Sequence, residues 1–253
     1  MAILEGTVWA TLAPWQLAAL ALAFLWSGFV RSGLGFGGAA LTLPLLLLVI
    51  DDPLVFLPAI GCQLLVFSLL TVATRLENVD WRYLRTLTLA LALPVAAGLV
   101  GLLNLSPTLL SALVYTVTLV YGLMYLLDRG IVSNSRVSDV MLIALGGYVS
   151  GVSLTGAPLI VAVGARRLPP PRLRDTLFVV WIVLVLAKLG TFVAAGVDLQ
   201  WRLFALTLPF VALGHVLGLR LHTRLVAGGA RGFRRLVGAG LTAVSSVGLL
   251  AVL

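Results

Sequence analysis

Glycines and hydroxyl side chains in two similar stretches are the residues with the clearest chemical potential. The first stretch, residues 31–44, reads "RSGLGFGGAALTLP", and the second, residues 150–159, reads "SGVSLTGAPL". Closely spaced glycines make a poor helix, so each stretch predicts a break between two half-helices. The half-helices after the breaks begin near Gly37 and Gly156. Each directs free N–H groups and a positive dipole end at its break, which favours an anion.

We expect the two breaks to face each other and to bind the anion together. Backbone N–H groups, hydroxyls, an arginine, an amide and two aromatic walls would surround it. Gln63 and Trp181 belong to this set because the offset that aligns the two stretches also aligns these two positions. Close helix packing is the favoured interpretation for Ala39, Ala40 and the Gly146–Gly147 pair. The candidate site residues are Arg31, Gly35, Phe36, Gly37, Gly38, Gln63, Ser150, Ser153, Leu154, Thr155, Gly156 and Trp181.

The composition is that of an integral membrane protein. Hydrophobic residues make up 61% of the 253 residues and charged residues 10%, whereas about a quarter of a soluble domain is charged. The net charge of +8 comes from arginines in short links, which are typical of topology signals rather than of a nucleic-acid surface. The sequence therefore predicts an all-α membrane fold with apolar segments at 14–30, 37–50, 53–75, 83–103, 107–127, 138–151, 156–165, 173–196, 203–221 and 235–253.

The order of these segments predicts two repeats, residues 1–128 and 129–253, within one transmembrane domain. Equivalent links differ in charge: Asp51 and Asp52 follow the second segment, whereas Arg166 and Arg167 follow the seventh. The positive-inside rule then orients the repeats oppositely, with both termini outside the cell membrane. Inverted repeats build secondary transporters with a site near the bilayer midplane. We expect segments one and two, and six and seven, to form broken or re-entrant hairpins.

Few other polar residues interrupt the apolar segments. Lys188 either takes part in the site or snorkels to a helix end, and His215 is expected to make an ordinary helix contact. All nine acidic residues are expected at segment ends or links, which disfavours cation transport and favours an anionic substrate. The lone cysteine, Cys62, cannot form a disulfide within the chain. We expect no cofactor and no metal.

The duplicated "GFGGAALTLPLL" and "GVSLTGAPLIVA" resemble the two glycine-rich motifs of the TauE/SafE family of sulfite and organosulfonate exporters, over essentially the whole chain. The second motif departs from the family pattern, since Ser153, Leu154 and Thr155 stand where glycines are commoner. The resemblance implies export of sulfite, sulfoacetate or a related sulfur-containing anion. We expect alternating access to carry out this transport.

Two other functions stay open at this point. A non-transporting assembly or scaffold protein would have continuous helices through residues 31–38 and 150–156. An intramembrane hydrolase would pair Ser150 with His215, although the motif spacing and the lack of an oxyanion-hole group disfavour it. The expected partners are a small anionic substrate and the lipid bilayer, without nucleic acid. A homodimer is left open, as are the coupling ion and the identity of the anion.

Overall fold

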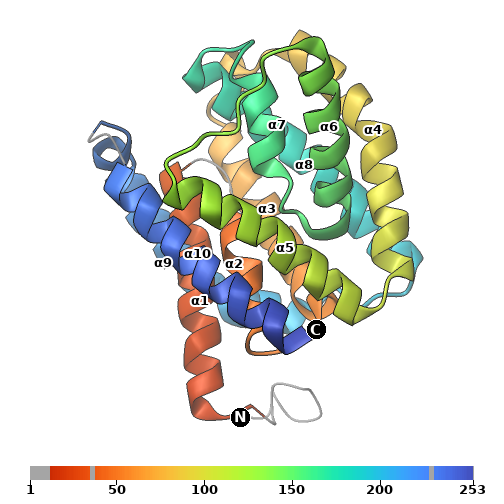
Figure 1. Ribbon diagram of the computed structural model, residues 1–253, viewed down its shortest axis with the longest axis vertical. Coiled ribbons are helices and arrows are strands. Elements are labelled where there is room, and N and C mark those ends of the chain that lie inside the picture. The colour runs from red at the N-terminus through yellow and green to blue at the C-terminus, as the bar shows by residue number, and fades with distance from the viewer. Residues whose placement is uncertain (1–11, 35–37, 228–230, 253) are drawn as a thin grey trace.

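The computed structural model describes residues 12–34, 38–227 and 231–252, and the regular elements in them are helical. This confirms the all-α prediction, and each expected segment corresponds to one α-helix (Figure 1). In order, the elements are α1 (Pro14–Leu34), α2 (Gly38–Leu47), α3 (Pro53–Val72), the 3-10 turn η2 (Leu76–Asn78), α4 (Trp81–Asn104), α5 (Pro107–Leu126), α6 (Arg136–Ser153), α7 (Ala157–Gly164), α8 (Pro170–Ala194), α9 (Trp201–Ala227) and α10 (Arg231–Val252).

The polar residues that bound the apolar segments act as helix caps. The Asp52 side chain accepts a hydrogen bond from the N–H of Leu54 at the start of α3, and Asp80 accepts one from Tyr83 at the start of α4. Ser106 caps α5 in the same way, ahead of a proline in the first helical turn. Side-chain acceptors at this position satisfy N–H groups that have no partner within the helix, so the sequence itself sets these helix starts.

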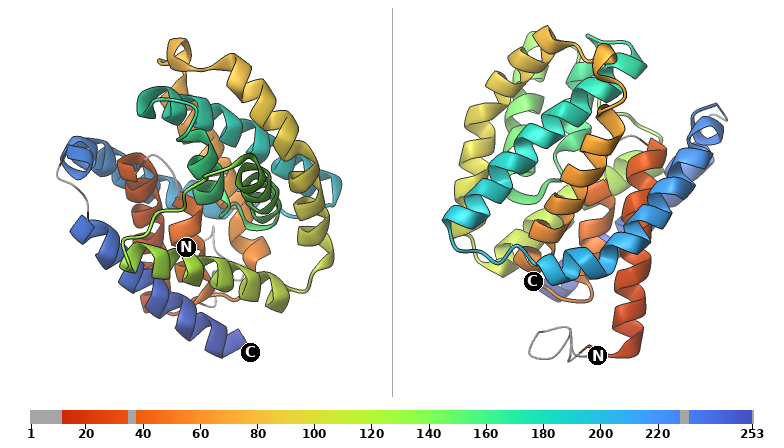
Figure 2. Two further views of the ribbon diagram at one scale, coloured as in Figure 1. Left: turned by 45° about the horizontal axis from the view of Figure 1, so that its top comes forward. Right: turned by 180° about the vertical axis from the view of Figure 1, so that it is seen from behind.

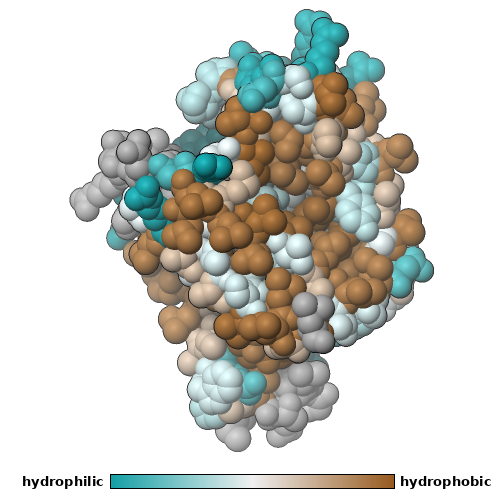
Figure 3. Space-filling view, viewed as in Figure 1, coloured by the Kyte–Doolittle hydropathy of each residue, from teal (hydrophilic) through white to brown (hydrophobic). Residues whose placement is uncertain are grey.

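Six helices among the described residues are long and apolar enough to cross a membrane: α3, α4, α5, α8, residues 201–220 of α9 and residues 235–252 of α10. Large apolar side chains point outward from them, with Leu93 80% exposed and Leu250 82% exposed. On the face drawn in Figure 3, hydrophobic residues cover the middle and hydrophilic residues gather at the upper end. Lipid is the solvent that suits such a surface. The chain is an all-α integral membrane protein.

Two helix pairs flank a central pair. Helices α1 and α9 run together on the left of Figure 1, and α4 and α6 pack together on the right. Helices α3 and α8 pack against each other between them, as the right panel of Figure 2 shows, and α5 packs on α10. If each of the first five α-helices is matched with the α-helix five places later, α1 corresponds to α6 and α4 to α9. The α1–α9 pair then corresponds to the α6–α4 pair, and the α3–α8 and α5–α10 pairs each correspond to themselves. The packing therefore has the pattern that two repeats would produce.

Glycines allow the flanking helices to approach closely. A Cβ on Gly98 of α4 would lie 2.9 Å from the Cα of Gly151 in α6, and one on Gly147 would lie 2.7 Å from the Cβ of Pro94. Gly146 likewise leaves no room for a Cβ against α7. Small residues serve this purpose in membranes, where apolar burial alone gives helices little reason to associate. This confirms the packing interpretation of the Gly146–Gly147 pair. In the α1–α9 pair the same close approach occurs at Gly28, Gly214 and Gly218.

Candidate functional site

The first glycine-rich stretch separates α1 from α2. Helix α1 ends at Leu34 and α2 begins at Gly38. A Cβ on Gly38 would lie 3.0 Å from the Cβ of Arg31 and 3.4 Å from the carbonyl oxygen of Ser27, so α2 begins directly against the last turn of α1. The three expected site residues between the helices lie outside the described residues: Gly35, Phe36 and Gly37.

The second stretch separates α6 from α7, as predicted. Helix α6 ends at Ser153 and α7 begins at Ala157, which leaves a break of three residues. Leu154, at the start of this break, has a left-handed backbone with φ of 60°. A left-handed conformation costs a residue other than glycine about 1–2 kcal/mol, so the surrounding contacts must hold this turn in place.

A cavity of about 30 Å³ lies where the two breaks meet. This volume exceeds the roughly 10–15 Å³ that one water needs by the same measure. The first residues of both α2 and α7 line the cavity, together with parts of α1, α3, α6 and α8. Five of the expected site residues therefore share one wall: Arg31, Gly38, Ser150, Leu154 and Trp181.

Two buried polar groups in this wall lack partners. Arg31 is 5% exposed; its Nη1 donates to the carbonyl oxygen of Gln63 at 3.3 Å, and its Cζ lies 4.3 Å from the centre of the Phe67 ring. Its Nη2 has no hydrogen-bond partner among the described residues, and neither does the hydroxyl of Ser150. Buried polar atoms are rarely left unpaired. Because a guanidinium only donates, and the described residues that line the cavity include no acidic side chain, the wall suits an anionic oxygen.

Four expected ligands lie beside the cavity and not in its wall. Gln63 donates from Nε2 to the hydroxyl of Thr207 at 2.7 Å and supports Arg31 through its carbonyl. The hydroxyls of Ser153 and Thr155 bond to each other at 2.7 Å, because the left-handed turn between them brings them together. The Cα of Gly156 lies against the Ser150 hydroxyl and leaves no space for a side chain. The direct contribution of these four residues to anion binding stays a prediction.

Six wall residues were not among the expected site residues, and one of them, Ala39, was expected only to pack helices closely. Three of them follow from helical geometry, because Phe178, Leu184 and Val185 lie three or four residues from Trp181 and share its face of α8. The spacing around Trp181 is therefore a signal that could have found them. The remaining wall residues are Ala39, Leu64 and Ala157.

Two further basic residues within the apolar segments, Lys188 and His215, both have partners. Lys188 is 1% exposed, and its Nζ donates to the carbonyl oxygens of Gly151 and Val152, so snorkelling to a helix end is wrong. His215 contacts the hydroxyl of Ser32 through Nδ1, which confirms the helix-contact interpretation. The pairing of His215 with the serine at position 150 that a hydrolase would need is not formed.

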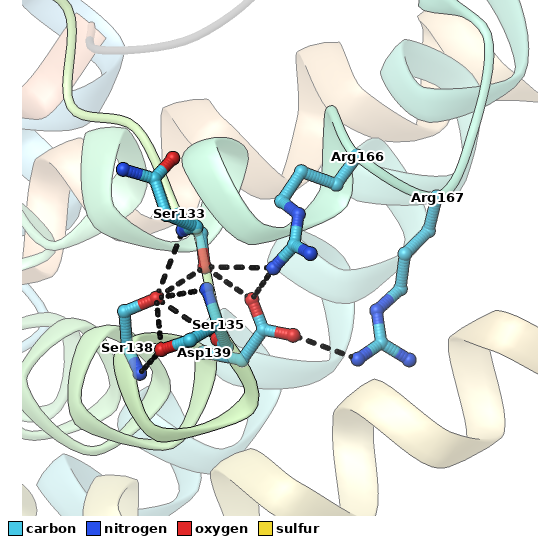
Figure 4. A network of polar contacts seen from close by, with 7 residues as sticks. Ser133, Ser135, Ser138, Asp139, Arg166 and Arg167 are labelled. Carbon is cyan, nitrogen blue, oxygen red and sulfur yellow. Dashed lines mark hydrogen bonds and ion pairs between the residues drawn. The ribbon is translucent and has the colours of Figure 1, made fainter.

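Asp139 closes the base of the α6–α7 hairpin (Figure 4). Its Oδ1 lies 3.1 Å from Nη1 of Arg166, and its Oδ2 lies 2.9 Å from Nη2 of Arg167, both just after α7. The hydroxyl of Ser133 donates to the same carboxylate. The Ser133 hydrogen bond first, and then that from Arg167, lower the pKa of Asp139 below its usual value. Such charge-assisted contacts hold the two ends of the hairpin together while its tip forms the cavity.

The acidic residues that the structure describes lie in links or in the first two turns of a helix, which confirms the expectation that acids lie at segment ends or links. Asp139 and Asp175 are buried inside the first two turns of α6 and α8. Asp175 accepts a hydrogen bond from Nδ2 of Asn78, which ties η2 to the start of α8. Neither residue lines the cavity. The described wall residues therefore include no acidic side chain.

The fold and the site together define a polytopic α-helical membrane protein with a buried cavity, suited to an anion, between two interrupted helices. The family model described as "Sulfite exporter TauE/SafE" matches residues 20–247, and the chain belongs to this family. Membership makes it a membrane transporter of the exporter type. No curated protein and no solved structure matches the chain significantly.

Proposed function

We propose that this protein exports a small sulfur-containing oxyanion, such as sulfite or a compact organosulfonate, and that the cavity between the two breaks binds it. The observation that carries the proposal is a pair of buried groups in the wall without partners among the described residues, Nη2 of Arg31 and the hydroxyl of Ser150. A sulfite or sulfonate head presents three oxygens, so it can accept from both groups while the starts of α2 and α7 contribute positive helix ends. Family membership supports the same class of substrate.

We further propose that residues 1–128 and 129–253 are inverted repeats. By rocking against each other, they would open the anion site alternately to the two sides of the membrane. The exchange of helix pairs between the two halves supports this proposal. The arginine-rich links give the expected orientation, with both chain termini on the outer side of the cell membrane. Alternating access around a fixed midplane site is the mechanism that such repeats provide.

The proposed role is that of a transporter without enzymatic activity. A scaffold protein has no use for interrupted helices that share a cavity, and the α6–α7 break interrupts residues 150–156. The partners we propose are the anion and the bilayer, and a homodimer would be compatible with this role. No step of the proposed cycle requires a cofactor or a metal.

Transport by purified protein in liposomes tests the proposal. Liposomes loaded with radiolabelled sulfite should lose label at a rate that saturates with sulfite concentration, and unlabelled sulfite outside should accelerate the loss by exchange. Ser150→Ala should raise the half-saturating concentration by roughly 10- to 150-fold, because a hydrogen bond to a charged group contributes about 1.5–3 kcal/mol. Ser111→Ala, which removes a buried hydroxyl of α5 outside the cavity wall, is the matched control. Efflux that does not saturate would contradict a carrier, and unaltered kinetics in Ser150→Ala would contradict the site.

A further inference from the structure

Lys188 is a buried cation that does not belong to the cavity wall. It lies well inside α8, and its Nζ donates to the carbonyl oxygens of Gly151 and Val152, the latter at 3.1 Å. Both carbonyls belong to the last turn of α6. Carbonyls in the last turn of a helix lack the N–H partner that a continuing helix would supply. Lys188 therefore caps the helix end that the break creates.

Among the described residues, no acidic side chain pairs with Lys188. The two ion pairs found among the described residues both belong to the Asp139 cluster. Helices α3 and α7, which pack against α8, contain no charged residue. The acid nearest along α8 is Asp175, 13 residues away and so about 20 Å along the helix. The charged residues of the other elements packed on α8 lie in η2 or in the first two turns of α4 and α6: Glu77, Arg82, Arg85, Arg136 and Asp139.

The ammonium of Lys188 lies close to the cavity. Trp181, Leu184 and Val185 line the wall, and Lys188 follows on the same face of α8 at the same helical spacing. Along α6, the two carbonyls that it binds lie between the wall residues at positions 150 and 154. The charge therefore stands about one helical turn, roughly 5 Å, from the cavity wall.

A break of this kind brings two opposite helix ends to one place. The start of α7 carries a partial positive charge that attracts an anion, and the end of α6 carries a partial negative charge that repels one. A cation on the last carbonyls of α6 removes the repulsion. In the other hairpin, Arg31 occupies the last turn of α1 and lines the same cavity. Each interrupted hairpin thus has one buried cation at the end of its first helix.

We propose that Lys188 is a positioning and charge-balancing residue of the anion site, which neutralises the end of α6 so that the cavity accepts an anion. The proposal rests on the proposed function, because it requires that the cavity binds an anion. Its consequence is a dependence on ligand charge. The Coulomb energy between the ammonium and a ligand is proportional to the ligand charge. The fold-loss of affinity caused by removing the ammonium should therefore be about the square for a dianion of what it is for a monoanion.

The test compares two ligands with similar heads, methanesulfonate as a monoanion and sulfate as a dianion, in one mildly acidic buffer that leaves the charge of both unchanged. Lys188→Gln keeps N–H donors for the two carbonyls but removes the charge. With a charge about 10 Å or less from the ligand and an effective dielectric constant of about 20, methanesulfonate affinity should fall about tenfold and sulfate affinity about a hundredfold. Lys188→Arg should restore both affinities to within about threefold of the wild type, because it restores the charge. Ser68→Ala, a buried hydroxyl on α3 outside the wall, should change neither.

Each outcome has a distinct meaning. Equal loss of both affinities in Lys188→Gln would show distortion of the site and would overturn the charge-balancing role, as would unchanged affinities. If neither Lys188→Gln nor Lys188→Met folds while Ser68→Ala does, Lys188 is needed for the fold and the proposal is wrong. If the wild-type protein binds neither ligand, the proposed function fails first.

Discussion

Replacing Arg31 by methionine separates the stability of the protein from its affinity for anions. The methionine keeps an unbranched side chain but removes the guanidinium, whose Nη2 has no partner among the described residues. Burying a charge costs several kcal/mol of desolvation, and even a buried ion pair can often be exchanged for apolar side chains with a neutral effect or a stabilisation of about 1–4 kcal/mol. The variant loses the hydrogen bond to the Gln63 carbonyl and the contact with Phe67, each contributing about 1–2 kcal/mol. We therefore expect the ligand-free variant to be within about 2 kcal/mol of the wild type.

The effect of Arg31→Met on anion binding should be much larger. A guanidinium about 4 Å from an anion contributes about 4 kcal/mol to the free energy of binding at an effective dielectric constant of about 20. A hydrogen bond to a charged group contributes about 2 kcal/mol, which gives the lower limit of the expected loss. This range corresponds to a loss of affinity of roughly 30- to 900-fold. Arg31→Lys keeps the charge without the planar pair of donors, so its affinity for the anion should lie between those of Arg31→Met and the wild type.

Thermal unfolding of purified protein measures both quantities. Sulfite should raise the unfolding temperature of the wild type with increasing concentration, since a ligand of the folded state stabilises that state. The unfolding temperature of Arg31→Met should stay nearly constant over the same range. An Arg31→Met protein that sulfite stabilises as strongly as the wild type would refute the assignment of Arg31 to the site.

Three further outcomes are expected. Asp139→Asn should lower the free energy of unfolding by about 1–3 kcal/mol at neutral pH. Because the folded-state pKa of this carboxyl is lowered, its contribution is present at neutral pH and lost as the pH falls below about 4, so urea unfolding curves of variant and wild type should converge in acid. Gly156→Ala should destabilise by about 1–3 kcal/mol, whereas Gly190→Ala, where a Cβ meets open space, should not; equal effects would contradict the packing at the break. Cysteines introduced at Asp52 and Arg167 should react with impermeant reagents from opposite sides of the membrane, and labelling from one side would contradict the inverted repeats.

The helices were predictable because their signals are local. Apolar runs define their lengths, and Asp52, Asp80 and Ser106 cap helix starts that follow directly from sequence. The break after α6 was predictable for the same reason, since a short run of small and hydroxyl residues makes a poor helix. Its left-handed residue is Leu154 and not the nearby glycine, which depends on the contacts around the turn.

The composition of the cavity wall was only partly predictable, because the hydrogen-bond partner of each polar side chain depends on how the helices pack. Ser153 and Thr155 satisfy each other across a single turn, which leaves the hydroxyl of Ser150 as the unpaired one. Gln63 aligns with Trp181 in the proposed repeat, yet it donates to Thr207 of α9 beside the wall. These outcomes depend on how α6, α8 and α9 pack, which no local pattern encodes.

The most direct test of the central claim is the position of a bound anion. Selenite has the shape and charge of sulfite and contains a heavy atom, so crystals grown with selenite would show the anion in an anomalous difference map at the selenium edge. We predict one selenium peak between the starts of α2 and α7. Its position should place selenite oxygens within hydrogen-bonding distance of Nη2 of Arg31 and of the hydroxyl of Ser150. A selenite that binds in solution but gives its peak elsewhere on the protein would contradict the assignment of the cavity as the transport site.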